Sequence, residues 1–259
     1  MIVTPDTTVR DIVVEDFRAA AVFYRHGIDF CCGGGRTLEQ ACRERRVSAS
    51  AVLAELQRTI SAADHLAPRY GDWSPETLIA YIIGRHHAYL RSAMPVIAAH
   101  TKKIAAAHGV RHPELAAIAE AFEAMAAELT THMAKEEKIL FPYISAVADA
   151  VSRGDQLPRA PFGSIDNPIR MMEHEHDIAG SLTARIRELS GGFVVPEDGC
   201  TTYRVCFEEL AAFERDLHEH VHLENNVLFP KARALAQSGP LEGLPCERIA
   251  VREGGPAAS

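Results

Sequence analysis

Apolar residues recur at helical spacing along four long stretches in the later part of the chain. In the first stretch, for example, Leu78, Ile82, Ile83 and Leu90 fall on one stripe of a helix. The modest connections between the stretches favour neighbouring helices that run antiparallel. The pattern therefore predicts an all-α protein with an antiparallel four-helix bundle, whose helices cover residues 74–108, 113–147, 168–189 and 201–236.

Prolines and glycines mark the expected irregularities of this bundle. Pro95 is expected to kink the first helix, and Pro142 is expected to interrupt the second helix near its end. A connection rich in Gly and Pro covers residues 152–167. The segment 192–196 is the one candidate strand, and we interpret it as a loop.

The first part of the chain shows shorter patterns, which predict a small helical domain over residues 1–65. One or two short helices are expected over 8–24, a capping box at Thr37 opens a helix that ends near Arg45, and another helix begins at Ser48. This unit is small for an independent core, so we expect it to lean on the rest of the chain or on a partner. Residues 64–73 resemble a linker to the bundle (74–236), and residues 237–259 are expected to form a loose tail.

Composition and charge exclude several function classes. The chain has 259 residues, of which 47% are hydrophobic, and its formal net charge is -8. Such a charge argues against a nucleic-acid-binding protein, which normally presents a basic face. We also find no apolar run long enough to span a membrane and no signal peptide, so the expected location is the cytoplasm. In that reducing compartment the six cysteines are expected to be thiols. We expect the protein to be a monomer or a homodimer.

One phrase, His-x-x-x-Glu-x-x-x-Leu-Phe-Pro, occurs twice in the predicted bundle. The first copy begins with His132 and Glu136, and the second begins with His220 and Glu224. A spacing of four residues places the imidazole and the carboxylate one turn apart on the same helix face. Two such pairs, on two helices, supply half of a two-metal site inside a helix bundle. The alternative is a duplicated helix pair that kept these residues for surface ion pairing.

The other two long helices carry histidine clusters near their middles. The first has His86 and His87, and the third has His174 and His176; adjacent positions on a helix diverge by about 100 degrees, so only one of each cluster can point inward cleanly. Apolar periodicity is compatible with His176 facing inward but leaves His174 as a competitor, and it does not decide between His86 and His87. Buried histidines that serve only the core are the alternative interpretation.

Four histidines and two glutamates, divided between two ions, suit iron with bridging carboxylates and an oxo or hydroxo bridge. The predicted set is His87, His132, Glu136, His176, His220 and Glu224. Zinc would need no second ion, and manganese usually takes more carboxylate. Glu128 and Glu175 are expected either to orient these ligands and line a route for iron, or to be surface carboxylates. We expect His100, His108 and His112 to be solvated, and His222 to be exposed or to support a ligand.

The N-terminal domain carries two adjacent cysteines, Cys31 and Cys32, followed by three glycines. Backbone N–H groups and a helix dipole near them are expected to stabilise a thiolate, and a bond between adjacent cysteines would be strained and redox-active. We therefore predict a thiol relay at this pair. The alternative is that one thiol is packed in the core and that the other has no role.

Together these motifs resemble the iron–sulfur cluster repair family of di-iron proteins, which have a short cysteine-bearing domain and a hemerythrin-like domain. The resemblance covers about residues 5–235 and is carried by four segments: Asp29-Phe-Cys-Cys-Gly-Gly-Gly-Arg-Thr-Leu, His132-x-x-x-Glu136-Glu-x-Ile-Leu-Phe-Pro, Glu175-His176-Asp177-x-Ala-Gly180 and His220-x-x-Leu-Glu224-Asn-Asn-x-Leu-Phe-Pro. The resemblance implies the same six ligands and selects His87 over His86. It further implies a non-haem di-iron centre with two bridging glutamates and an oxo bridge.

The resemblance also implies a function: repair of iron–sulfur clusters damaged by nitrosative or oxidative stress, by donation of iron. The expected partners are damaged iron–sulfur proteins, with nitric oxide or oxygen as small ligands of the iron. Two alternatives use the same centre: a nitric oxide reductase, in which the thiols supply electrons, and a sensor that binds nitric oxide or oxygen without turnover. Whether the protein is an enzyme is left open at this stage, and the cysteine pair disfavours the sensor.

Overall fold

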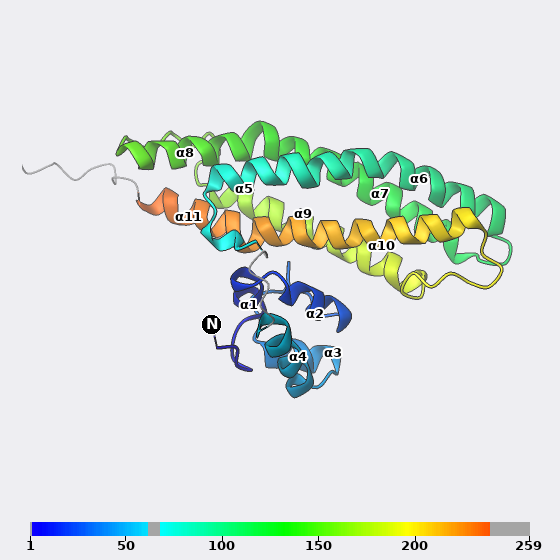
Figure 1. The fold of residues 1–259 in the computed structure, drawn as a ribbon. Helices are drawn as coiled ribbons and strands as arrows, with labels where there is room; N and C mark the ends of the chain where they lie inside the picture. The colour runs from blue at the N-terminus through cyan, green and yellow to red at the C-terminus, as the bar shows by residue number, and fades with distance from the viewer. Residues whose placement is uncertain (1, 62–67, 239–259) are drawn as a thin grey trace, which may run out of the picture.

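The computed structural model describes residues 2–61 and 68–238, and within these residues the regular secondary structure is helical apart from one isolated bridge between Thr8 and Thr37. The predicted all-α bundle is confirmed: four long rods run side by side, and a small helical domain lies against them (Figure 1). The segment 192–196 is a loop, as expected. The described part of the chain contains no helix long and apolar enough for a membrane span.

The N-terminal domain consists of four short helices. They are α1 (Val9–Glu15), α2 (Ala19–Arg25), α3 (Leu38–Arg45) and α4 (Ala49–Ser61). The predicted capping box is present, because the Thr37 side chain accepts from the Gln40 N–H while the Gln40 side chain accepts from the Thr37 N–H. A short 3₁₀ turn, η1 (Tyr70–Asp72), follows residues that lie outside the described part of the chain and precedes the bundle.

Three of the four rods combine α-helices with one π-helical turn. The first rod is α5 (Pro75–Tyr81), η2 (Ile82–His87) and α6 (Ala88–His108); the second is α7 (Glu114–Lys135), η3 (Glu136–Leu140) and α8 (Phe141–Arg153). The third is the uninterrupted α9 (Asp166–Leu189). The fourth is α10 (Thr201–His222), η4 (Leu223–Leu228) and α11 (Phe229–Ser238), so Gln237 and Ser238 are helical; the rest of the predicted tail lies outside the described residues.

The prolines of the repeated phrase explain two of the three π turns. Pro142 and Pro230 each stand at the second residue of the helix that follows a π turn. Proline has no N–H to donate to the preceding turn, and its ring crowds the carbonyl four residues earlier, so the turn before it widens. Pro142 thus interrupts the α-helix as predicted, although the rod continues. Pro95 lies inside α6, which remains helical through it.

The polar centre of the bundle lies between two apolar clusters. Along the second rod, Leu115 to Met133 belong to one cluster, whereas Leu140, Phe141 and Ile144 belong to the other. The same change occurs along the fourth rod, after Val221. The first cluster also includes the core of the N-terminal domain, such as Ile12 and Phe23. Hydrophobic burial therefore fixes the rods on both sides of the polar residues.

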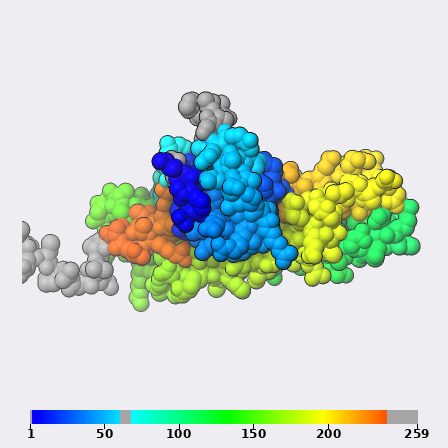
Figure 2. All heavy atoms as spheres, turned by 90° about the horizontal axis from the view of Figure 1, so that it is seen from below, coloured from blue at the N-terminus to red at the C-terminus, as the bar shows by residue number. Residues whose placement is uncertain are grey.

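The N-terminal domain packs across the middle of the bundle, over the third and fourth rods (Figure 2). The Asn226 amide donates to the carbonyl oxygens of Phe30 and Cys31, at 3.0 and 3.2 Å. The Tyr24 hydroxyl donates to Glu214 Oε2 at 2.7 Å, and Glu214 also accepts from Arg187 Nε at 2.9 Å. The expectation that the small domain leans on the rest of the chain is thus met within the chain itself.

Candidate metal centre

Six buried side chains, drawn from all four rods, converge at the centre of the bundle. They form two groups of four potential metal ligands, and the ligand atoms within each group lie within 4.8 Å of one another. One group contains His87 and His220, and the other contains His132 and His176. Both groups also contain Glu136 and Glu224, one carboxylate oxygen facing each side. The structure thus brings together all six residues predicted as ligands.

The distances show how both carboxylates are shared. Glu136 Oε2 lies 3.4 Å from His87 Nε2, while Glu136 Oε1 lies 3.2 Å from His132 Nε2. Glu224 Oε1 lies 3.0 Å from His220 Nε2, while Glu224 Oε2 lies 3.0 Å from His176 Nε2. The four imidazoles therefore all turn Nε2 toward the centre. This is the arrangement in which two cations can be held side by side with two bridging glutamates.

The π turns lie at this point of the rods. His87 ends η2, Glu136 begins η3, and Glu224 is the second residue of η4. A π turn inserts about one extra residue into a helix, and such turns are frequent at functional sites. They change the direction in which the following side chains point, so apolar periodicity alone cannot give the facing of His86 and His87.

Three of the four imidazoles are held in place through Nδ1. His87 Nδ1 lies 2.7 Å from Glu137 Oε1, His132 Nδ1 lies 2.8 Å from Glu175 Oε2, and His176 Nδ1 lies 2.8 Å from Asn225 Oδ1. An acceptor at Nδ1 fixes the tautomer that leaves Nε2 free to bind a metal. Glu137 and Asn225 each follow directly after a shared glutamate. Sequence reasoning missed both, although they occupy equivalent positions in the two copies of the repeated phrase.

The carboxylates of the centre are strongly biased toward the ionised form. Burial disfavours a charge on Glu224, but the charges and close contacts of His220 and His176 outweigh it and hold the Glu224 pKa well below its usual range. At His132, burial likewise opposes the charged form, yet the charge and close contact of Glu136 and the hydrogen bond to Glu175 raise the pKa to about 9. The environment thus gathers negative charge where a cation would sit.

The residues fit a cation-binding role on a structural observation. Both oxygens of Glu136 and Oε2 of Glu224 are fully buried, and none of them has a partner with hydrogen-bond geometry among the described residues. Buried carboxylate oxygens without such a partner are costly unless a cation compensates them. The donor set of imidazole nitrogen and carboxylate oxygen suits iron.

The two further carboxylates predicted near the ligands border the centre on one side. Glu128 and Glu175 line a small cavity together with the ligand candidate His132. Glu175 is tied at both ends, because its other oxygen accepts from Lys135 Nζ at 2.5 Å. Glu128 therefore lines the same cavity as Glu175, but of these two carboxylates only Glu175 forms a hydrogen bond with a ligand candidate among the described residues.

The competing histidines take other roles. His174 is exposed, whereas His176 is buried. His86 is fully buried but faces Asp216, with Nδ1 3.1 Å from Asp216 Oδ1, and it stacks at 5.6 Å on the ring of His220. His108 was expected to be solvated, but this is wrong: it is buried against Tyr203, because the last turn of α6 packs against the start of α10.

His222 is fully buried between the bundle and the N-terminal domain. Its ring lies 5.6 Å from that of Phe17 and 5.9 Å from that of Phe30, and burial lowers its pKa to about 3. Exposure of this side chain, one of the two predicted possibilities, is therefore wrong. The domain that covers it lies far away in sequence.

The cysteine pair lies in a larger cavity between the N-terminal domain and α9. Cys31 is buried, Cys32 is half-buried, and their Sγ atoms are 4.0 Å apart. Asp29 accepts from the N–H groups of Cys31, Cys32 and Gly33. The hydrogen bond to Cys32, burial and the nearby Asp29 charge raise the Cys31 pKa well above its usual value. A stabilised thiolate at Cys31 was expected and is wrong, because Asp29 takes the N–H groups that would have stabilised it.

Comparison with known proteins finds two family models that match separate parts of the chain. Residues 78–232 match the Hemerythrin HHE cation binding domain, and residues 5–59 match ScdA_N, a domain of unknown function (DUF542). The chain is 34% identical over 227 residues to the iron-sulfur cluster repair protein YtfE of Pectobacterium atrosepticum, covering 88% of this chain and 96% of the relative. It is 34% identical over 215 residues to the YtfE protein of Yersinia pestis, covering 83% of this chain and 91% of the relative.

These matches agree with the geometry of the centre, since a cation-binding domain coincides with the bundle that gathers the buried histidines and glutamates. The family predicted from the motifs is therefore confirmed. The chain belongs to the family of iron–sulfur cluster repair proteins, and in it the match to DUF542 precedes the match to the hemerythrin cation binding domain.

Proposed function

We propose that this protein repairs damaged iron–sulfur clusters by donating iron from a two-iron centre. The observation that carries the proposal is the pair of four-ligand groups that share Glu136 and Glu224. His87 and His220 would hold one ion, and His132 and His176 the other, with an oxo or hydroxo bridge completing the pair. The repair role is supported by the names of relatives that match nearly the whole chain.

Iron in this scheme is cargo, so the surrounding residues must allow it to leave. Bound iron supplies a change between ferric and ferrous states, and the ferrous ion is held less tightly. The small cavity lined by Glu128 and Glu175 lies beside His132, on the side of the second ion. Carboxylates there would accept a departing cation. Lys135 holds Glu175 in its hydrogen bond with His132, and Glu175 would become available to the cation when the bond to His132 breaks. We propose this side as the exit route.

An iron titration tests the centre itself. Protein loaded anaerobically should retain about two iron ions per chain, and Glu136→Gln and Glu224→Gln should each reduce the retained amount at both positions because each carboxylate serves both ions. Glu128→Gln should leave the retained amount unchanged and slow the release of iron to a chelator. Retention of a single ion by the unaltered protein would contradict the two-iron arrangement.

A repair assay tests the function. The iron-loaded protein is mixed with a hydratase whose cluster has lost iron, and recovery of hydratase activity is compared with iron lost from the protein. Matching amounts support donation. Retained iron together with production of nitrous oxide from nitric oxide would instead support the reductase. Replacement of both Cys31 and Cys32 by alanine should slow repair if these thiols relay iron or electrons, and unchanged repair would remove them from the mechanism.

A further inference from the structure

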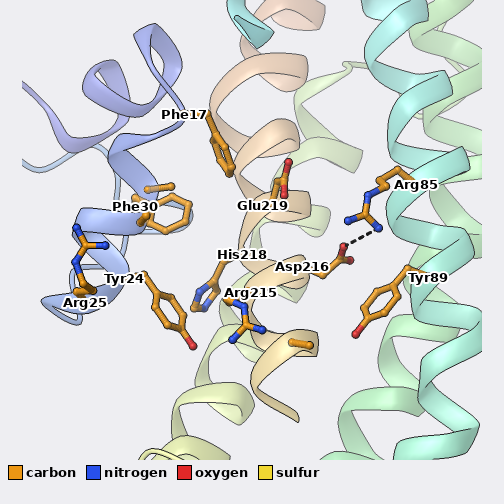
Figure 3. Close-up of a pocket in the computed structure, with 13 residues that line it drawn as sticks. Phe17, Tyr24, Arg25, Phe30, Arg85, Tyr89, Arg215, Asp216, His218 and Glu219 are labelled. Atoms are coloured by element: carbon orange, nitrogen blue, oxygen red, sulfur yellow. Dashed lines mark ion pairs between the residues drawn. The ribbon is translucent and has the colours of Figure 1, made fainter. Parts of the chain in front are cut away.

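A cavity of about 560 Å³ lies in the seam between α2 of the N-terminal domain and helices α6 and α10 of the bundle (Figure 3). None of the six candidate metal ligands lines it. Its volume lies within the range of about 300–1,000 Å³ that is typical of small-molecule sites. Sites of this kind occur preferentially at domain interfaces, as this one does.

Aromatic rings and small side chains form the walls of the cavity. Rings from both sides of the seam line it, namely those of Phe17, Tyr24, Phe30 and Tyr89. Ala20, Ala21 and Ala212 also line the cavity, and their small side chains fill little of it. A predominantly apolar wall of this kind favours a ligand with an apolar group, which would remove ring surface from water.

The bundle side of the cavity carries a buried acid. Asp216 is 8% exposed; its Oδ1 lies 3.1 Å from His86 Nδ1 and 3.8 Å from Arg85 Nη1, and its Oδ2 has no hydrogen-bond partner among the described residues. Glu219, one turn further along α10, adds a second carboxylate, which accepts from the Tyr70 hydroxyl at 2.7 Å. A buried carboxylate oxygen such as Asp216 Oδ2 calls for a donor, so a cationic donor such as an ammonium group suits this side.

A guanidinium lies next to this acid on the same helix. Arg215 is exposed, and within the described part of the chain no ion pair or hydrogen bond occupies its side chain. Figure 3 shows it between His218 and Asp216, with Arg85 on the opposite wall. The planar guanidinium matches a carboxylate through two parallel hydrogen bonds.

From this juxtaposition we propose that the cavity binds a small zwitterion, an α-amino acid with an apolar side chain. Its ammonium group faces Asp216, its carboxylate faces Arg215, and its side chain lies among the aromatic rings. A ligand with a single positive charge leaves the arginines without a counter-charge, and a ligand with a single negative charge leaves the two acids without one. The mixed lining therefore selects a ligand that carries both charges. This proposal is independent of the repair function and of the metal centre.

Calorimetric titration of the full chain with three related probes tests the charge requirement. L-Phenylalanine carries both charges, phenethylamine lacks the carboxylate, and 3-phenylpropionate lacks the ammonium group. We expect phenylalanine to bind at least about tenfold more tightly than either single-charge probe. Equal binding of the three probes, or no heat with phenylalanine at millimolar concentration, overturns the proposal.

Variants on α10 test the location. Arg215→Gln should reduce phenylalanine binding to the level of phenethylamine, and Ala212→Leu should fill the cavity and abolish binding of all three probes. Arg204→Gln and Ala211→Leu are matched controls on the same helix, because these residues line a neighbouring cavity instead. Both controls should bind phenylalanine as the unaltered chain does. A control that loses as much binding as its partner variant places the ligand elsewhere and overturns the proposal.

Discussion

At the scale of single residues, the metal centre depends on side chains that contact the ligands as well as on the ligands. The Asn225 amide oxygen is the acceptor for His176 Nδ1, at 2.8 Å. We predict that Asn225→Leu lowers metal affinity by about 10- to 100-fold, because His176 then loses the contact that fixes its tautomer and orientation. Asn225→Asp keeps an acceptor and should retain most of the affinity. Competition with a chelator measures both variants, and equal affinity in the leucine variant would contradict the prediction.

Cys200 offers a residue-scale test of pH dependence. Hydrogen bonding to His108 and to backbone N–H groups at the start of α10 lowers the pKa of this exposed thiol to about 7. A lowered pKa means that the thiolate dominates above that pH. The rate of alkylation at Cys200 should therefore rise between about pH 6 and 8 and then level off, whereas an ordinary thiol reacts ever faster up to about pH 9.

Mass spectrometry of the peptide that contains Cys200 gives this rate directly, without interference from the other thiols. Cys31 serves as an internal comparison, because its raised pKa and its burial should keep its alkylation slow over the same range. His108→Leu should shift the Cys200 midpoint upward. A midpoint near that of a free thiol in the unaltered chain would show that His108 has no such effect.

The sequence predicted the six ligand candidates because the repeated phrase places His and Glu one turn apart, which is a local property of any helix. It could not predict which of His86 and His87 faces the centre from periodicity alone. Both are fully buried, and only the contact of His86 with Asp216, on another rod, shows its different role. Asp29 illustrates the same limit, since its capture of three N–H groups depends on how a loop folds.

At the scale of elements, the π turn η4 joins the metal centre to the loop of residues 29–35 that carries Cys31 and Cys32, called the cysteine loop below. Glu224, Asn225 and Asn226 are consecutive residues of this turn: the first is shared between the two ligand groups, the second contacts His176, and the third donates to the Phe30 and Cys31 carbonyls. The prolines of the repeated phrase were visible in the sequence, but the widening of the preceding turns was not predicted. It follows from how the missing N–H is accommodated in a packed rod.

We predict that Asn226→Leu loosens the cysteine loop without removing a metal ligand. The buried carbonyls of Phe30 and Cys31 lose their donor, which costs about 1–3 kcal/mol. Alkylation of Cys32 and hydrogen exchange at residues 29–35 should both accelerate, while iron content stays unchanged. Asn167→Leu is the control, because Asn167 also donates to a backbone carbonyl, that of Phe162, but outside the N-terminal domain. Unchanged exchange in the loop would show that Asn226 does not hold it.

At the scale of the whole molecule, the docking of the N-terminal domain is what the sequence indicated least. Composition showed a unit too small for its own core, but not the surface on which it rests. Tyr24, on α2, reaches Glu214 and Arg187, which lie on two helices of the bundle, only after the domain has docked. The prediction that His222 could be exposed was wrong for the same reason, because periodicity within α10 contains no information about a domain that covers this side chain.

The ion pair between Arg187 on α9 and Glu214 on α10 lies within the bundle, at the surface where Tyr24 docks, and its removal tests what it contributes there. Glu214 is buried, whereas the Arg187 side chain is 37% exposed. We predict that Arg187→Leu lowers the free energy of unfolding by about 2 kcal/mol, between the values for exposed and buried pairs, because the Glu214 charge loses its partner. Replacing Glu214 by leucine as well should restore most of the loss. Urea unfolding measures both variants; an equal loss in the double variant would show that packing and not charge is responsible.

Removal of the metal tests how far the centre holds the whole bundle together. The ligand candidates come from all four rods and lie between the two apolar clusters, so a bound cation would tie the rods together at a point between those clusters. A ligand that binds only the folded state adds about 2.7 kcal/mol when its concentration is a hundred times its dissociation constant. Chelation should therefore lower the unfolding temperature markedly. It should speed hydrogen exchange most in residues next to the π turns, and least in α1 to α4, whose core does not include the centre.

The variant that carries both Glu136→Gln and Glu224→Gln is the control. It lacks the two shared carboxylates that would hold a cation, so it should unfold at the same temperature with and without chelator. It also lacks the repulsion between their like charges, which opposes the ionisation of each carboxylate in the unaltered chain. If the unaltered chain also unfolds at one temperature in both conditions, the centre does not join the rods.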